Sequence, residues 1–463
     1  MNAPWARRLV RGPAALVELA GWWLATRVVT LLVLATPAEE GIIRDVYYYG
    51  RQLDAMFGGT PVTETLREYP LPAFAVFLAP RWLSELTPWT YASIFVTLMV
   101  ALDAAFVAGL WRVGRGPTPG LRVWLLLVPL LGPLTFTRFD VVSAVLAGAA
   151  VLALARPAAG APTRPALSGM LAAAGTAVKL WPAVLLPALV VRRDRPGRVL
   201  AGFAVVGVVA VGATLAVGGA TRLLSPLTWQ GDRGLQLETV WAVPLLFLRC
   251  VDPATWSTPY TKFFAFQVEG PGAGTLQALS TVATVACVLL LGWLYWRSWR
   301  AGPASPALVG LLAVAAACLL IVPNKTLSPQ YLLWIGGVLA ALGATAPAEP
   351  LLRRLNLLLV VGCAVTQVIY PIGYGMLTGP NWANVIGATL LLVRNGILIA
   401  ITVLAVRRVL ELTRRPGAAG TAGNTGTAGR TGTATGTGAT GTRGPAGPPA
   451  PTTGRPGRPA EAG

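Results

Sequence analysis

Histidine is absent from this chain, and acidic residues are scarce, with 18 of them against 37 lysines and arginines. The lack of histidine argues against a zinc site. The four cysteines form no Cys-x-x-Cys pair. Cys250 borders an apolar run, and Cys287, Cys318 and Cys363 lie inside such runs. This placement argues against a disulfide framework.

Two phosphate-handling motifs are also missing from the sequence. There is no G-x-x-x-x-G-K-[ST] loop, which would cradle the phosphates of a nucleotide. There is no D-x-D pair either, although transferases that use a metal and a nucleotide sugar usually carry one. We therefore expect neither a metal nor a cofactor.

What the sequence has in abundance is apolar residues. Hydrophobic residues make up 54% of the chain, charged residues only 12%, and the mean hydropathy is +0.63. Repeated apolar runs approach the roughly 20 residues that a helix needs to cross a bilayer. The composition predicts an all-α polytopic membrane protein. The net charge of +19 lies in short clusters between the apolar runs, where it sets orientation and does not indicate nucleic-acid binding.

The basic clusters predict the topology. Arg7, Arg8 and Arg11 precede the run 14–36, so we interpret 1–13 as a cytoplasmic N-terminus and 14–36 as an uncleaved signal anchor. Six later clusters should return to the cytoplasm: 112–122, 156–164, 192–198, 297–300, 353–354 and 407–415. About twelve crossings satisfy this rule: 14–36, 90–111, 123–136, 139–156, 166–178, 180–191, 199–218, 274–296, 305–323, 329–346, 357–377 and 385–406. Both termini are then cytoplasmic.

Two segments need a special interpretation if every basic cluster is to lie in the cytoplasm. The proline-containing segment 70–86 is expected to be a juxtamembrane helix at the outer face. The apolar stretch 166–191 has arginines at both ends and is interrupted by Lys-Leu-Trp-Pro at 179–182, so it must enter the membrane and return. Each leg spans only about 18 Å of a core of roughly 30 Å. Short broken helices of this kind are tolerated where they line a polar cavity.

The predicted organisation is one membrane domain, 14–415, with a tail. Its outer loops are 37–89 and 219–273, and they contain most of the acidic residues, so we expect the chemistry on the outer face. The tail, 416–463, consists largely of Gly, Thr, Ala and Pro and is expected to be disordered in the cytoplasm.

Several short motifs, taken in order, resemble a known family. Asp45 and Tyr48 form Asp-x-x-Tyr in the first outer loop, and Glu68-Tyr69-Pro70-Leu71-Pro72 follows. Next come Arg138-Phe139-Asp140, then Lys179-Leu180-Trp181-Pro182, and finally Asn324-Lys325 with Ser328-Pro329-Gln330-Tyr331. In this order the chain, from about residue 14 to 406, resembles glycosyltransferase family 87.

The resemblance implies a fold and an activity. Members are integral membrane enzymes of the GT-C type that use polyprenyl-phosphate-mannose, so we expect a GT-C-like bundle. The expected activity is transfer of mannose to a lipid or glycan acceptor, at the outer face of a bacterial plasma membrane. One departure is that the late Ser-Pro loop has Gln330 and Tyr331 where the mannosyltransferases have histidine.

The chemistry of such a transfer suggests one base and several cations. The departing phosphate has a second pKa of about 6, so it needs positive charge more than a general acid. A single carboxylate then suffices, and Asp45 is the candidate general base for an inverting displacement, with Glu68 in reserve. The alternative is an ordinary interfacial aspartate beside an aromatic belt.

Candidate binding residues follow from the outer loops. The expected cations for the donor phosphate are Lys179, Arg138, Arg233 and Lys325. The expected sugar or acceptor contacts are Tyr48, Tyr69, Asp140, Gln236, Glu238, Asn324, Gln330 and Tyr331. Snorkelling of Lys179 and a local Arg138–Asp140 salt bridge are the structural alternatives. The intramembrane residues Arg27, Asp103 and Arg394 are assigned no role.

Two other classes of protein fit part of the pattern. A transporter or flippase for a lipid-linked sugar would also carry charges at membrane depth, but it should show corresponding broken helices in two halves. Only one clear broken hairpin occurs here. A non-catalytic scaffold would not need the clusters of acids and bases in the outer loops.

Overall fold

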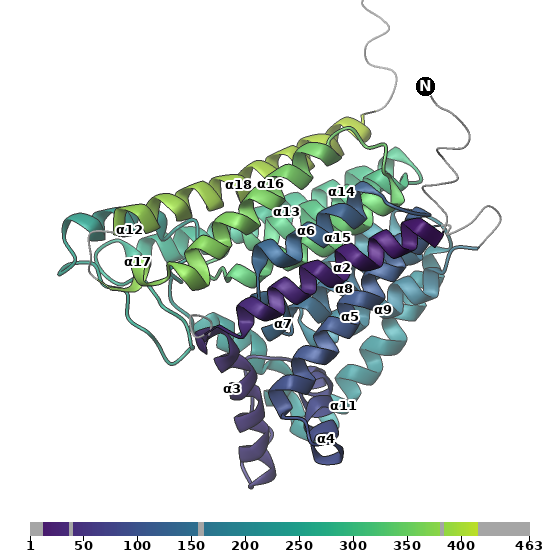
Figure 1. Cartoon of the computed structure of the whole chain (residues 1–463). Helices are drawn as coiled ribbons and strands as arrows, with labels where there is room; N and C mark the ends of the chain where they lie inside the picture. The colour runs from purple at the N-terminus through teal and green to yellow at the C-terminus, as the bar shows by residue number, and fades with distance from the viewer. Residues whose placement is uncertain (1–12, 37–39, 156–161, 380–383, 415–463) are drawn as a thin grey trace, which may run out of the picture. The chain divides into compact units, whose positions relative to one another are not determined.

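The computed structural model describes residues 13–36, 40–155, 162–379 and 384–414, and all of its regular elements are helical (Figure 1). In chain order they are α2 (Pro13–Leu34), α3 (Glu40–Phe57), η2 (Leu71–Ala73), α4 (Phe74–Leu86), α5 (Tyr91–Gly114), α6 (Pro119–Leu131), α7 (Leu134–Thr137), α8 (Asp140–Ala153), α9 (Pro165–Val178), η3 (Trp181–Leu185), α10 (Leu186–Val190), α11 (Pro196–Asp232), α12 (Val243–Val251), α13 (Ala273–Ala301), α14 (Pro306–Ile321), η4 (Pro329–Tyr331), α15 (Leu332–Thr345), α16 (Leu352–Gln367), η5 (Val368–Ile372), α17 (Gly375–Thr378) and α18 (Asn384–Leu412). The predicted tail 416–463 lies outside the described residues, as does the N-terminal segment apart from Pro13.

The chain is a multi-pass membrane protein, because 6 helices of the described part are long and apolar enough to cross a bilayer. These spans are Ala14–Leu34, Tyr91–Gly114, Pro196–Asp232, Ala273–Ala301, Leu352–Ile372 and Asn384–Leu412. A helix also covers each of the other predicted crossings, but these helices are shorter than a full span. The prediction of about twelve crossings is therefore not confirmed.

The short apolar helices form the core of the bundle. Nearly every residue of α14 and α15 is buried, whereas α11 exposes valines such as Val208, at 70%. An apolar helix with so much exposed valine is suited to face lipid. Glycine allows the short helices to pack closely: a Cβ on Gly120 of α6 would lie 2.0 Å from the carbonyl oxygen of Ala340 in α15. The core helices can be short because other helices, not lipid, surround them.

The broken hairpin and the juxtamembrane helix are both present. Helix α9 ends at Val178, Lys179 has an extended backbone, and η3 with α10 returns along α9. Segment 70–86 is covered by η2 and α4. The predicted crossing 199–218 ends at Gly219, where the backbone of α11 leaves the helical region with φ of 66°.

The segment 42–50 of the predicted outer loop 37–89 lies inside helix α3, a helix that was not predicted. Its buried residues Ile42, Val46, Tyr49 and Leu53 recur every three or four positions and form a single apolar face. The other faces of α3 are polar, so the helix is amphipathic, and it packs against α4 and α5. The aspartate and the tyrosines therefore point in defined directions.

The loops with basic clusters meet at one end of the bundle. Arg192, after α10, donates to the carbonyl oxygen of Ala304 before α14, at 2.9 Å. At the end of α13, Arg297 donates to the hydroxyl of Thr413, and Arg408 of α18 pairs with Glu349 at 2.8 Å. The candidate site residues lie at the opposite helix ends, which we call the site end. Which side of the membrane each end faces stays a prediction.

Candidate functional site

Asp45 lies on α3 and forms an ion pair with Arg138, the residue that ends α7. Arg138 also donates to the hydroxyl of Tyr370, at 3.3 Å. The side chain of Asp45 is 29% exposed and that of Arg138 is 16% exposed. The pair is therefore held in place but is still accessible, and the local Arg138–Asp140 salt bridge that we considered is not what forms.

Asp140 begins α8 and accepts hydrogen bonds from two partners at the same oxygen, Oδ1. Lys179 Nζ lies 2.6 Å away and the indole Nε1 of Trp334 lies 2.8 Å away. Asp140 is almost completely buried, whereas the side chain of Lys179 is 17% exposed. Lys179 therefore does not simply snorkel to the surface, because its ammonium group is held inside the bundle by a carboxylate.

Aromatic rings surround the ammonium group of Lys179. It lies 5.0–5.3 Å from the centroids of Phe139, Tyr331 and Trp334, which are cation–π distances. Trp334 stacks on Tyr331, and Trp181 stacks on the same indole with an interplanar angle of 7°. The rings fix Lys179 and leave part of it exposed.

Tyr48 and Glu68 form a second contact beside Asp45. The hydroxyl of Tyr48 donates to Glu68 Oε1 at 2.8 Å, and the Tyr48 ring packs against Phe264. Burial raises the pKa of Glu68, although the hydroxyl of Tyr48 and the charges of Arg222 and Arg233 oppose this shift. Burial also raises the pKa of Tyr48, so its hydroxyl stays protonated as a donor. Tyr69 lies nearby, with its ring edge-on to Phe139.

The late outer loops are joined to one another. The backbone amide of Gln236 donates to the carbonyl oxygen of Lys325, and its side-chain Nε2 donates to Ser328. Lys325 Nζ donates to the carbonyl oxygen of Gly231 at 2.7 Å, and burial lowers its pKa. Arg233 lies in the same region, with a longer bond to the carbonyl oxygen of Phe263. These contacts bring two predicted cations and one predicted amide together.

Three further predicted residues are Asn324, Glu238 and Gln330. Asn324 Oδ1 accepts from the backbone and side chain of Thr326, two residues on, and so stabilises its own turn. Glu238 is fully buried and pairs with Arg394 at 3.2 Å, while the hydroxyl of Tyr374 also donates to it. Gln330 lies half-buried in η4. The roles that the sequence suggested for these three residues stay predictions.

Several residues of the site were missed. Trp334 was not singled out, although it follows Tyr331 by three positions, and Trp181 was named only as part of the Lys-Leu-Trp-Pro motif. Gln267 lies opposite Gln236 in an antiparallel bridge. The flanking bonds, from Leu237 to Phe266 and from Val268 to Leu235, make this a non-hydrogen-bonded pair, in which side chains approach closely. Only the folded chain brings them together.

Buried polar atoms without a partner also occur at the site end. Among the described residues these include Arg138 Nε, Arg233 Nε, Gln236 Oε1 and Gln267 Nε2. An unpartnered buried donor or acceptor costs roughly 1–3 kcal/mol, so such atoms call for a bound water or ligand. In the same part of the chain, no group of three His, Cys, Asp or Glu residues is arranged to hold a metal ion.

Comparison with protein families decides the identity. The sequence model of glycosyltransferase family 87 matches residues 68–323, more than half of the chain. The chain belongs to glycosyltransferase family 87. It is therefore a membrane glycosyltransferase. The match covers the Glu68, Arg138, Asp140 and Lys179 positions of this family 87 protein, whereas Asp45 and the Asn324–Tyr331 segment lie outside it. Searches of curated proteins and of solved structures found no match.

Proposed function

We propose that this glycosyltransferase moves mannose from a polyprenyl-phosphate-linked donor to a lipid or glycan acceptor, with inversion at the anomeric carbon. The reaction would take place at the outer face of a bacterial plasma membrane, in a GT-C-like fold. The main support for this proposal is that two ion pairs, Asp45–Arg138 and Asp140–Lys179, lie next to each other at the site end. Arg138 and Asp140 are separated by a single residue, so one turn of chain links the two pairs.

The roles of the two pairs differ in this proposal. Asp45 is accessible, and its arginine partner favours the ionised carboxylate that a base needs. Asp140 is buried and orients Lys179 through a short hydrogen bond. An ammonium group has three donors, so Lys179 can bind a phosphate oxygen while it keeps its bond to Asp140. Arg138, Arg233 and Lys325 would add positive charge around the same phosphate.

The reaction can be written as one displacement. The acceptor hydroxyl oxygen attacks the anomeric carbon, and its proton passes to Asp45 as the new glycosidic bond forms. The bond from the anomeric carbon to the phosphate oxygen breaks, and its electron pair leaves with the polyprenyl phosphate. That phosphate gains one negative charge, which the nearby cations stabilise as it develops. A single attack from the opposite face inverts the configuration.

The remaining candidate residues would bind the sugar and the acceptor. Tyr48, three residues after Asp45 in α3, and Tyr69, which packs on Phe139, could stack on a sugar ring, while the Gln236 amide supplies a free acceptor oxygen. Asp140, Glu238, Asn324, Gln330 and Tyr331 complete the proposed set. Glu238 and Asn324 act in it mainly by shaping the loops, since their oxygens already have partners in the chain.

The test is to purify the protein and measure transfer of labelled mannose from polyprenyl-phosphate-mannose to extracted membrane lipids. The proposal predicts labelled lipid or glycan, together with release of polyprenyl phosphate in equal amount. A flippase would instead move the intact donor across a vesicle membrane without releasing polyprenyl phosphate. That result, with no transfer to any acceptor, would contradict the proposal.

A further inference from the structure

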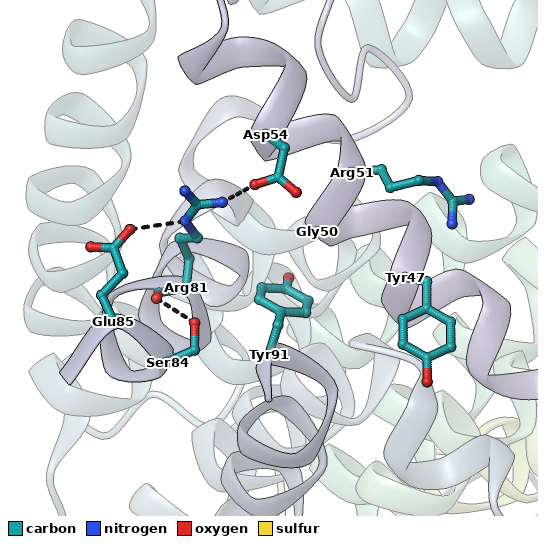
Figure 2. Close-up of a pocket in the computed structure, with 8 residues that line it drawn as sticks. All are labelled: Tyr47, Gly50, Arg51, Asp54, Arg81, Ser84, Glu85 and Tyr91. Carbon is teal, nitrogen blue, oxygen red and sulfur yellow. Dashed lines mark hydrogen bonds and ion pairs between the residues drawn. The ribbon is translucent and has the colours of Figure 1, made fainter. Parts of the chain in front are cut away.

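A cavity of about 340 Å³ lies between α3, α4 and α5, apart from the site described above (Figure 2). Its size is at the lower end of the range for small-molecule sites. Side chains from α3 and α4 form two of its sides, and Tyr91 at the start of α5 lies between them. The lining residues are Tyr47, Gly50, Arg51, Asp54, Arg81, Ser84, Glu85 and Tyr91.

The cavity and Asp45 lie on opposite flanks of the same helix. Successive residues of an α-helix are turned by about 100°, so Asp45 and Tyr48 point to one side of the buried face of α3. Asp54 points to the other side, toward Arg81 of α4, whereas Arg51 also lines the cavity but extends away from α4 (Figure 2). The contacts agree: Tyr48 bonds Glu68, whereas Asp54 bonds Arg81 of α4. The cavity is therefore a second site and not an extension of the first.

The charges of the cavity cancel. Arg81 forms ion pairs with both Asp54 and Glu85, and Arg51 is the other cation. Two arginines and two acids give a formal charge of zero. A phosphate would lie beside two carboxylates with only one arginine not already paired to an acid, which makes the cavity a poor site for the donor phosphate. The cations around Asp45 and Lys179 suit that group far better.

Free hydrogen-bonding groups of both kinds remain. The hydroxyl of Tyr91 is buried and has no partner among the described residues. Arg51 is exposed and forms no ion pair in the described part of the chain. Tyr47 also lines the cavity and is 48% exposed (Figure 2). Donors, acceptors and aromatic faces thus lie side by side, a combination that matches a ligand with several neutral hydroxyl groups.

We infer that this cavity binds a carbohydrate. A sugar hydroxyl can donate to a carboxylate oxygen of Asp54 or Glu85 and accept from Arg51 or Tyr91, while an apolar face of the sugar ring can lie on Tyr47. Two large rings on the same helices, Trp82 of α4 and Phe57 of α3, are each 57% exposed. Exposed aromatic rings favour a position of α3 and α4 at the membrane–water interface. The ligand is either the remote sugars of the acceptor, which rests on the proposed function, or a separate saccharide.

The experiment measures binding of methyl α-mannoside to the full-length protein by saturation-transfer NMR, without any transfer reaction. Tyr91→Phe removes only the unpartnered hydroxyl and should weaken binding about 5-fold, the effect of roughly one hydrogen bond. Arg51→Ala should weaken it at least as much. The matched control is Arg67→Ala, because Arg67 is exposed and does not line the cavity. It should bind like the wild type.

Three further results decide the outcome. Binding should persist in Asp45→Asn, because Asp45 lies on the other flank, and inorganic phosphate should not displace the mannoside. If Tyr91→Phe and Arg51→Ala both bind normally, or if phosphate competes, the inference is wrong even if the enzyme transfers mannose. If they bind weakly and also raise KM tenfold only for acceptors with several sugars, the ligand is the acceptor. If the two variants bind the mannoside weakly but keep the wild-type KM for every acceptor, the ligand is a separate saccharide. This result also supports a carbohydrate site in the cavity.

Discussion

Two buried aspartates of this protein have cationic partners, and their surroundings differ sharply. Asp103 of α5 accepts four hydrogen bonds, from Arg27 Nε and Nη2 and from the indoles of Trp23 and Trp124, all at 2.7–2.8 Å. Both of its oxygens are used, and neither side chain of the pair is more than 2% exposed. Asp140 has two donors at a single oxygen, and its partner Lys179 is 17% exposed.

The difference separates a structural pair from a pair with spare binding capacity. Taking two charges out of water is costly, and the Asp103–Arg27 pair offsets that cost by satisfying nearly every group. Lys179 keeps donors in reserve, and its side chain is partly exposed. We therefore expect changes at Asp103 to affect folding, and changes at Asp45, Asp140 or Lys179 to affect chemistry or donor binding.

The largest effect on activity is expected for Asp45→Asn. The amide keeps the size and polarity of the carboxylate but cannot take a proton, so turnover should fall by roughly 10²–10⁴-fold. Donor binding should survive, because the phosphate contacts lie on other residues. Glu64→Gln is the control, since Glu64 is an exposed acid of the same region.

An Asp45→Asn protein that unfolds more easily but turns over normally per folded molecule would reduce Asp45 to a structural residue. In that case Glu68→Gln becomes the variant to examine. Glu68 is the base if that substitution abolishes turnover and leaves donor binding intact.

Asp103→Asn should have the largest effect on stability. It leaves the buried guanidinium of Arg27 without a counter-charge, which costs roughly 3–5 kcal/mol. Thermal unfolding in detergent should show the loss, while turnover per folded molecule stays near the wild-type value. The double change Arg27→Met with Asp103→Leu should recover only part of the stability, because the indoles of Trp23 and Trp124 then lose their acceptor. A normal unfolding temperature for Asp103→Asn would remove the basis of the comparison.

Lys179→Ala should weaken donor binding by roughly 10- to 100-fold, the worth of a charge-assisted hydrogen bond. Lys179→Arg should retain part of the affinity, because it supplies charge with a different geometry. Titration of the purified variants with polyprenyl-phosphate-mannose gives both values. Wild-type affinity in the alanine variant would show that Lys179 only neutralises Asp140.

The smallest effect concerns pH and Glu68. Since burial raises the pKa of Glu68, its protonated form fits the folded protein better, and the wild type loses some stability as pH rises through that folded-state pKa. Glu68→Gln has no such loss. The unfolding temperature of the variant relative to the wild type should therefore rise between pH 4 and pH 8, by roughly a few degrees. If the difference in unfolding temperature between Glu68→Gln and the wild type does not change with pH, the raised pKa of Glu68 is contradicted.

Much of the fold could be predicted because apolar length and basic clusters are local properties of the sequence. The reversal at Lys179 follows from arginines at both ends of a single apolar stretch. Helix α3 was missed because its apolar residues occupy only one face, and the run of tyrosines hid the spacing of Ile42, Val46 and Tyr49. The number of crossings was harder to predict, since short apolar helices occur both as membrane spans and as buried core.

The candidate site was predicted as a set of residues but not as a set of contacts. The motifs indicated Asp45, Arg138, Asp140 and Lys179, yet the one pairing considered among them was a local Arg138–Asp140 salt bridge, whereas each ion pair joins residues far apart in the chain. The pairing of Glu238 with Arg394 spans 156 positions and has no local signal. Trp334 could have been noticed because it follows the Ser-Pro motif and carries an indole N–H donor. Only folding brings that N–H to Asp140.

The most direct measurement is the anomeric configuration of the transferred sugar in a single turnover with donor labelled by ¹³C at the anomeric carbon. The account has one carboxylate base and one direct displacement, so it predicts that the product has the configuration opposite to that of the donor. Retention of configuration would require a covalent sugar–enzyme intermediate, and would contradict the assignment of Asp45 as a base acting on the acceptor.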